Sequence, residues 1–79
     1  MEQKQFTTLD LYLSAFLELH GNQPTLEINN GRVVFAFPQS DKLYKLINAY
    51  NSNEPVPVTD YISVLKALKG QMLAKRGQR

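Results

Sequence analysis

Residues 25–37 read TLEINNGRVVFAF, and this stretch decides which kind of domain the chain forms. At its centre, Asn30-Gly31 is the dipeptide preferred in two-residue type I′ turns, and apolar residues alternate with others on both sides of it. The stretch therefore predicts a β-hairpin with strands at residues 25–29 and 32–37.

A two-residue turn also sets the register of the two strands. It pairs Ile28 with Val33 and Leu26 with Phe35, and Phe37 continues the same face. We expect this apolar face to pack on helices, because an isolated hairpin is only marginally stable. The other face is mixed and is compatible with solvent or with a partial cover; it consists of Thr25, Glu27, Asn29, Arg32, Val34 and Ala36.

The segment before the hairpin predicts a helix over about residues 8–20. Thr7 stands at the N-cap position and Asp10 follows three residues later, which is the spacing of a capping box with Asp in place of the usual Glu. Gly21 follows the last apolar residues as a C-cap, and Pro24 prevents the helix from restarting.

This predicted helix is apolar over most of its circumference. Asp10, Ser14 and Glu18 are spaced four apart and form one narrow stripe, which we expect to be solvated. The remaining apolar arc is about 240° wide at about 100° per residue, against the roughly 100° of an ordinary surface helix. Such a helix is either central to the core or covered by a second copy of the chain in a homodimer.

A second helix is predicted to start at Ser40 or Asp41 and to run to about Asn51. Its apolar residues follow helical spacing and form one buried stripe of Leu43, Leu46, Ile47 and Tyr50. Residues 54–58, EPVPV, then predict an extended linker, because each proline disfavours a helical conformation of the residue before it.

A third helix is predicted to be capped by Thr59 or a residue nearby, with Asp60 favourable in its first turn. Its apolar stripe consists of Tyr61, Val64, Leu65, Leu68 and Met72. Met72 lies beyond Gly70 and favours a helix that continues through the glycine, which costs about 1 kcal/mol relative to alanine. Residues from Ala74 onward are expected to fray.

The predicted fold is therefore a small single α+β domain of order α-β-β-α-α. A two-stranded antiparallel hairpin packs against three helices within residues 6–73. We expect a disordered N-terminus at residues 1–5 and a basic, flexible C-terminal tail at residues 74–79.

The composition speaks against catalysis and metal binding. The chain of 79 residues has no cysteine, and its single histidine, His20, lies in the last turn of the first predicted helix, where the helix dipole stabilises it. Asp10 and Glu18 lie about 12 Å apart along that helix, too far to act on one substrate atom. The four glycines are too scattered to form a phosphate-binding loop. We expect a protein that is not an enzyme, takes no small-molecule substrate and needs no metal or cofactor.

The apolar stretch from Leu9 to Leu19 is too short to cross a bilayer, and three polar residues interrupt it. The absence of cysteine fits a reducing compartment. We therefore expect a soluble, cytoplasmic protein without a membrane partner.

Charge is distributed unevenly along the chain. Residues 1–61 hold four basic and seven acidic side chains, whereas residues 62–79 hold five basic ones and no acid. The five are Lys66, Lys69, Lys75, Arg76 and Arg79. Such asymmetry indicates a polyanionic partner, most simply nucleic acid bound through its phosphates, although a basic end can also serve solubility alone.

A second hypothesis is a protein-interaction or homodimerisation module. In that case the wide apolar arc of the first helix, or the face carrying Val34 and Ala36, would meet another protein or a second copy.

Three segments together resemble a known family: residues 6–13 leading to His20-Gly21, residues 30–35, and residues 56–58 with 65–69. The chain resembles a family of short bacterial and phage proteins that is classed only as a domain of unknown function. The resemblance covers about residues 6–73 and implies a complete stand-alone domain. It carries over no catalytic or binding residue, and occurrence in phage and mobile elements favours a role near DNA.

Overall fold

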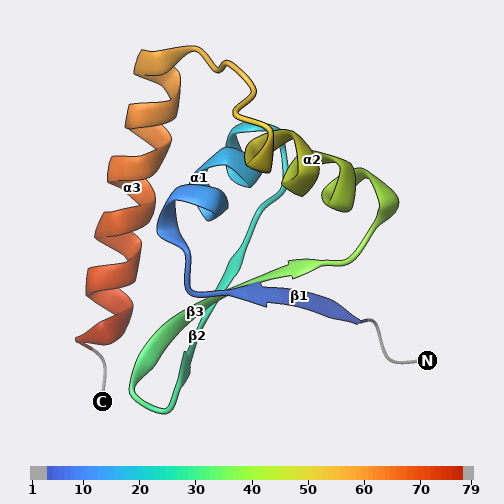
Figure 1. Cartoon of the computed structure of the whole chain (residues 1–79). Coiled ribbons are helices and arrows are strands. Elements are labelled where there is room, and N and C mark those ends of the chain that lie inside the picture. The colour runs from blue at the N-terminus through green and yellow to red at the C-terminus, as the bar shows by residue number, and fades with distance from the viewer. Residues whose placement is uncertain (1–3, 78–79) are drawn as a thin grey trace.

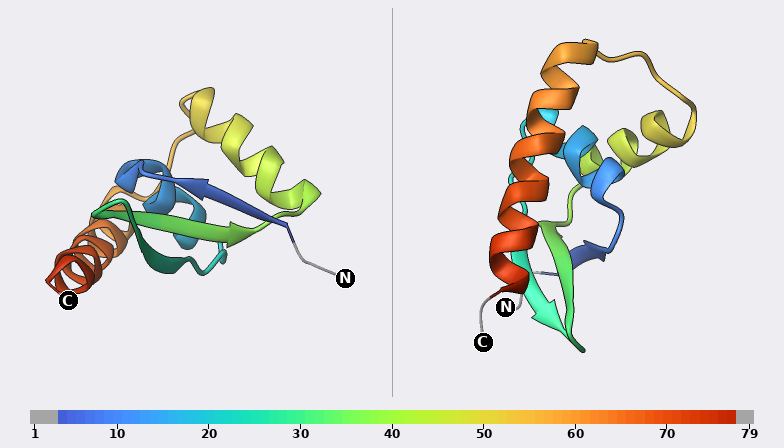
Figure 2. Two further views of the ribbon diagram at one scale, coloured as in Figure 1. Left: turned by 90° about the horizontal axis from the view of Figure 1, so that it is seen from below. Right: turned by 90° about the vertical axis from the view of Figure 1, so that its left-hand side faces the viewer.

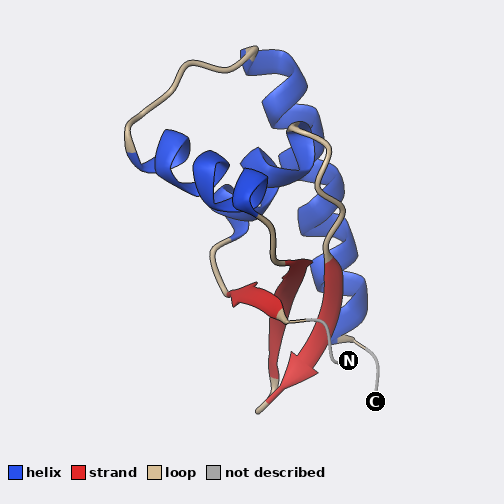
Figure 3. Ribbon diagram, turned by 90° about the vertical axis from the view of Figure 1, so that its right-hand side faces the viewer, coloured by secondary structure: helices blue, strands red, loops and turns tan. Residues whose placement is uncertain are grey.

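The computed structural model describes residues 4–77 and shows an α+β domain with a three-stranded antiparallel sheet (Figure 1). The elements are β1 Gln5–Thr8, α1 Leu11–Leu19, β2 Thr25–Asn29, β3 Arg32–Pro38, α2 Asp41–Asn51 and α3 Val58–Arg76. The strands lie in the order β1-β3-β2. Figure 3 shows the strands at one end of the domain, α1 and α2 at the other, and α3 running alongside both.

The predicted hairpin is confirmed. β2 and β3 pair antiparallel with Ile28 opposite Val33 and Leu26 opposite Phe35. Asn30 and Gly31 both have positive φ, 54° and 77°, which is the conformation that a type I′ turn requires. The apolar face of β3 forms the core together with side chains of all three helices; the buried cluster is Leu13, Ala15, Phe16, Leu17, Phe35, Phe37, Leu43 and Leu68.

The sheet contains one strand more than the sequence predicted. Residues 5–8 form β1, which pairs with β3 and sets Phe6 opposite Phe37 and Thr8 opposite Phe35. An aromatic and two β-branched residues favour a strand, and pairing covers an edge that would otherwise be open. Gln5 thus belongs to the sheet, whereas residues 1–3 of the expected disordered N-terminus lie outside the described part of the chain.

The first helix begins later than expected, and Thr7 is not its cap. The N-cap of α1 is Asp10, whose Oδ1 accepts hydrogen bonds from the amides of Tyr12 and Leu13 at 3.0 and 3.1 Å. Asp10 reaches these amides because the strand ends at Thr8 and the chain turns there. At the other end, Gly21 takes a φ of 95°, in agreement with its predicted role after the helix.

Of the two alternatives for α1, the structure shows the helix in the core, and of its polar stripe only Asp10 is exposed. Ser14 is fully buried, and its hydroxyl donates to the carbonyl of Asp10 at 2.8 Å. Glu18 is half-buried, and its Oε1 has no hydrogen-bond partner within residues 4–77. Ser14 and Glu18 are covered because α1 packs against α2 and α3 and contributes to the core, whereas Tyr12 of the apolar arc stays 57% exposed.

The helices after the hairpin follow the prediction closely. Ser40 caps α2 by accepting the amide of Leu43 at 3.0 Å. Helix α3 starts at Val58 with Pro57 at the N-cap position, two residues earlier than a Thr59 cap would give, and continues through Gly70. It extends to Arg76, so residues 74–76 of the expected tail are helical.

Candidate nucleic-acid interface

Four of the five predicted phosphate-binding residues lie on α3. Lys66, Lys69 and Arg76 are exposed, whereas Lys75 is half-buried. Arg79 lies outside the residues that the structure describes. The arrangement of these cations therefore follows from the geometry of one continuous helix.

Three of the cations share one side of α3. At about 100° per residue, Lys66, Lys69 and Arg76 fall within an arc of about 80°, over about 15 Å of helix length. Leu73 lies in the same arc and is 50% exposed. Lys75 instead falls within about 20° of the buried Leu68, so it is directed toward the core side of the helix and away from the other three.

The structure adds a fourth cation, Arg32 of β3. The C-terminal half of α3 runs alongside the hairpin (Figure 2), which brings Arg32 and Arg76 to one surface pocket of about 420 Å³. Leu9, Val33 and Met72 also line this pocket. We call Arg32, Lys66, Lys69 and Arg76 the basic surface.

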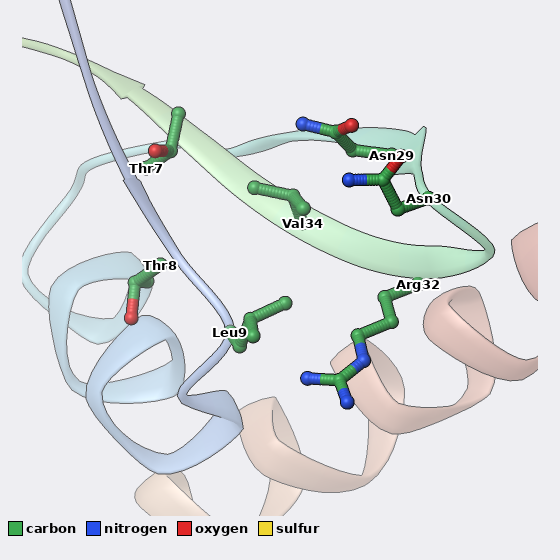
Figure 4. Close-up of a pocket in the computed structure, with 7 residues that line it drawn as sticks. All are labelled: Thr7, Thr8, Leu9, Asn29, Asn30, Arg32 and Val34. Carbon is green, nitrogen blue, oxygen red and sulfur yellow. The ribbon is translucent and has the colours of Figure 1, made fainter.

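A second pocket, of about 600 Å³, shares Leu9 and Arg32 with the first. Figure 4 shows Arg32 reaching from β3 past Leu9 toward α3, with the side chains of Asn29 and Asn30 near the hairpin turn. Polar groups dominate its lining, which consists of Thr7, Thr8, Leu9, Asn29, Asn30, Arg32 and Val34. Among the described residues, no acidic side chain lines either pocket.

Within residues 4–77, one edge of β3 beside these pockets is unpaired. The β1–β3 ladder ends at Thr8 opposite Phe35. Residues 32–34 therefore have a partner in β2 but none on the β1 side. Leu9, which leaves the sheet at this point, is 53% exposed.

The aromatic rings of β3 offer no exposed surface on which nucleic-acid bases could stack. Phe35 and Phe37 are fully buried in the core. His20 is held by its own helix, because its Nδ1 lies 2.9 Å from the carbonyl oxygen of Phe16 and its ring lies 4.4 Å from the Phe16 ring. Its role in the described structure is therefore local packing.

Two further properties concern only residues 4–77. No group of three or more His, Asp or Glu side chains there is placed to hold a metal ion. No helix there is long and apolar enough to cross a membrane.

Comparison with known proteins identifies a family but no activity. Residues 3–74 match the family model described as "Domain of unknown function (DUF5659)", which confirms the resemblance expected from the sequence. No curated protein and no solved structure matches the chain.

Proposed function

We propose that this chain, which belongs to the DUF5659 family, is a non-enzymatic protein that binds nucleic acid through the phosphate backbone. The observation that supports this most is the meeting of Arg32 of β3 with Arg76 of α3 at one pocket. Lys66 and Lys69 lie on the same side of α3 as Arg76, and no acid follows Asp60 in the sequence.

The side chains on this surface suit phosphate recognition. Arginine offers planar, bidentate donors to phosphate oxygens, and lysine offers a point charge. Thr8, Asn29 and Asn30, around the pocket next to Arg32, add the neutral donors that commonly complete phosphate contacts. Contacts of this kind position a nucleic acid without reading its sequence, so we expect little sequence preference.

Duplex is the form of nucleic acid that fits best. Single strands are usually held by stacking of bases on exposed aromatic rings. None of the residues that define the basic surface or line its two pockets is aromatic. A duplex can be bound by protein cations that contact its phosphate backbone, and the basic surface supplies such cations.

The test is a fluorescence anisotropy titration of labelled duplex and single-stranded DNA and RNA with the wild-type protein and two variants. R32Q/R76Q removes two cations of the basic surface. Lys42→Gln combined with Lys45→Gln removes the same charge from exposed positions on α2 and serves as the matched control. We expect at least a tenfold loss for R32Q/R76Q and a much smaller loss for the control. Absence of binding by the wild type at about 50 mM salt would reject the proposal.

A second candidate function is binding of another protein, and the unpaired edge of β3 favours it. An extended segment of a partner or a second copy can add a strand at residues 32–34 and bury Leu9. Light scattering over a range of concentrations tests the homodimer. We expect a mass that rises with concentration in the wild type and not in Val34→Glu. A constant monomer mass in both would exclude a second copy as the partner that adds a strand to β3, and would leave a different protein in that role.

A further inference from the structure

A third pocket, of about 470 Å³, lies where α1, α2 and α3 come together around the linker between α2 and α3. Phe16, Tyr50 and Tyr61 line it, one aromatic ring from each helix. The linker contributes Glu54, and none of the lining residues is basic. This pocket shares no lining residue with the two beside the basic surface.

The aromatic walls are held in place by the fold. Phe16 is only 2% exposed and lies with its ring centroid 5.5 Å from that of Tyr50, at an interplanar angle of 61°. The hydroxyl of Tyr61 donates to the carbonyl oxygen of Tyr12 at 2.9 Å. The rings are thus positioned before any ligand arrives.

The end of α2 fixes Glu54 next to these rings. Asn53 adopts a φ of 62°, its amide donates to the carbonyl of Tyr50 at 3.0 Å, and the amide of Glu54 donates to the carbonyl of Ala49 at 3.1 Å. This is the hydrogen-bond pattern of a Schellman motif. The main chain of Glu54 is therefore defined relative to Tyr50, although its side chain is exposed.

The charges near the pocket are negative. Burial, and after it the charge of Asp10, raises the pKa of the Tyr50 hydroxyl; burial, Tyr50 and Asp10 do the same to the pKa of Tyr61. The C-terminus of α2 adds the negative end of a helix dipole. The positive ends of α1 and α3 each carry an acid, Asp10 as the N-cap of α1 and Asp60 in the first turn of α3.

We propose that this pocket binds an organic cation, an alkylammonium group of the kind carried by lysine side chains and by quaternary amines. Aromatic faces attract such a group through their quadrupole, and a carboxylate at the rim adds direct charge attraction. The pocket has the volume of a small-ligand site. Glu54 supplies the charge, Tyr50 and Tyr61 supply the accessible aromatic surface, and the nearly buried Phe16 packs against Tyr50.

The experiment compares ligands that share a shape but differ in charge. Choline and n-butylammonium represent the quaternary and the lysine-like source, and 3,3-dimethyl-1-butanol is the neutral isostere of choline. Each is titrated into the full chain labelled with ¹⁵N, and the shifts of the amide signals of Tyr50, Asn53, Glu54 and Tyr61 are followed. We expect at least one of the two cations to bind tenfold or more tightly than the alcohol.

Two variants complete the test. Glu54→Gln is expected to weaken cation binding at least threefold, because it removes the charge at an exposed position without disturbing the core. Asp41→Asn, at the other end of α2, removes the same charge at an exposed position and is expected to leave binding unchanged. The proposal is overturned if neither cation shifts these signals, if the alcohol binds equally well, or if Glu54→Gln has no effect.

Discussion

The hydroxyl of Tyr61 in α3 donates a hydrogen bond of 2.9 Å to the main-chain carbonyl of Tyr12 in α1. This bond joins the first turn of α3 to the first turn of the central helix. It helps to set the direction in which α3 runs toward the hairpin, and that direction brings Arg76 beside Arg32. A contact at one end of α3 thus supports the basic surface at the other.

Tyr61→Phe removes this hydrogen bond and keeps the ring. We expect the free energy of unfolding to fall by about 0.5–1.5 kcal/mol, as for a typical hydrogen bond within a protein. Urea denaturation measures the change, with Tyr44→Phe as a control, because the Tyr44 side chain is exposed and no hydrogen bond of its hydroxyl is found among residues 4–77. An equal effect of the two substitutions would show that the bond contributes nothing.

Glu18→Gln is expected to stabilise the protein at pH 7. Burial raises the pKa of the Glu18 carboxyl in the folded state, so its ionised form disfavours folding. When folding raises the pKa of an acid, this penalty is absent below the pKa that the acid has in the unfolded chain. It reaches its full size above the pKa that the acid has in the folded protein. The difference in unfolding free energy between variant and wild type should therefore shrink as the pH falls toward about 4.5, the ordinary pKa of a glutamate, and vanish below it.

The control for Glu18 is Glu27→Gln, at an exposed position of β2. It removes the same charge at a position that the fold does not cover, so it should change the stability little. A difference between Glu18→Gln and the wild type that stays constant from pH 7 to pH 4 would contradict a penalty due to ionisation.

Asp10→Ala tests where α1 begins. It removes the acceptor of two amide hydrogen bonds and should cost about 0.5–2 kcal/mol, the usual effect of losing an N-cap. Thr7→Ala should cost only a few tenths of a kcal/mol, since Thr7 is an exposed strand residue and not the cap. Chemical denaturation of both variants distinguishes a helix α1 capped by Asp10 from a longer one capped by Thr7. A larger effect of Thr7→Ala would favour the longer helix.

Gly70→Ala should stabilise the domain by about 0.5–1 kcal/mol. Gly70 lies inside α3, and a Cβ there would meet no atom within 4 Å. Gly31→Ala should destabilise it, because Gly31 has a φ of 77°, which strains a residue with a side chain. Thermal unfolding of the two variants shows whether each one is more or less stable than the wild type. A loss of stability in Gly70→Ala would mean that this position needs glycine for a reason other than packing within the chain.

The sequence predicted those features of the fold that depend on residues close together in the chain. The Asn30-Gly31 turn sets the register of β2 and β3 by itself, and Ser40 caps α2 through a hydrogen bond three residues away. Strand β1 was not predicted, because its four residues are too few to show an alternation of apolar and polar side chains. Phe6 and Thr7 are also compatible with the start of a helix, and the partner edge of β1 lies on β3, far along the chain.

The same limit applies to the candidate site. The position of Lys66 and Lys69 on one side of a continuous helix was available from the sequence, and so was the separate direction of Lys75. The addition of Arg32 was not, because it depends on how α3 lies against the hairpin. Likewise, the spacing of Ser14 and Glu18 places them on one side of α1 but does not say which element covers that side.

The central claim is that the basic surface binds phosphates, and the salt dependence of duplex binding tests it most directly. With four contacts, the logarithm of the association constant should fall with the logarithm of the salt concentration with a slope of about −3.6, or about 150-fold in affinity between 50 and 200 mM. R32Q/R76Q should reduce that slope by about half. An unchanged slope in R32Q/R76Q, or no binding by the wild type at the lower salt concentration, would contradict the account.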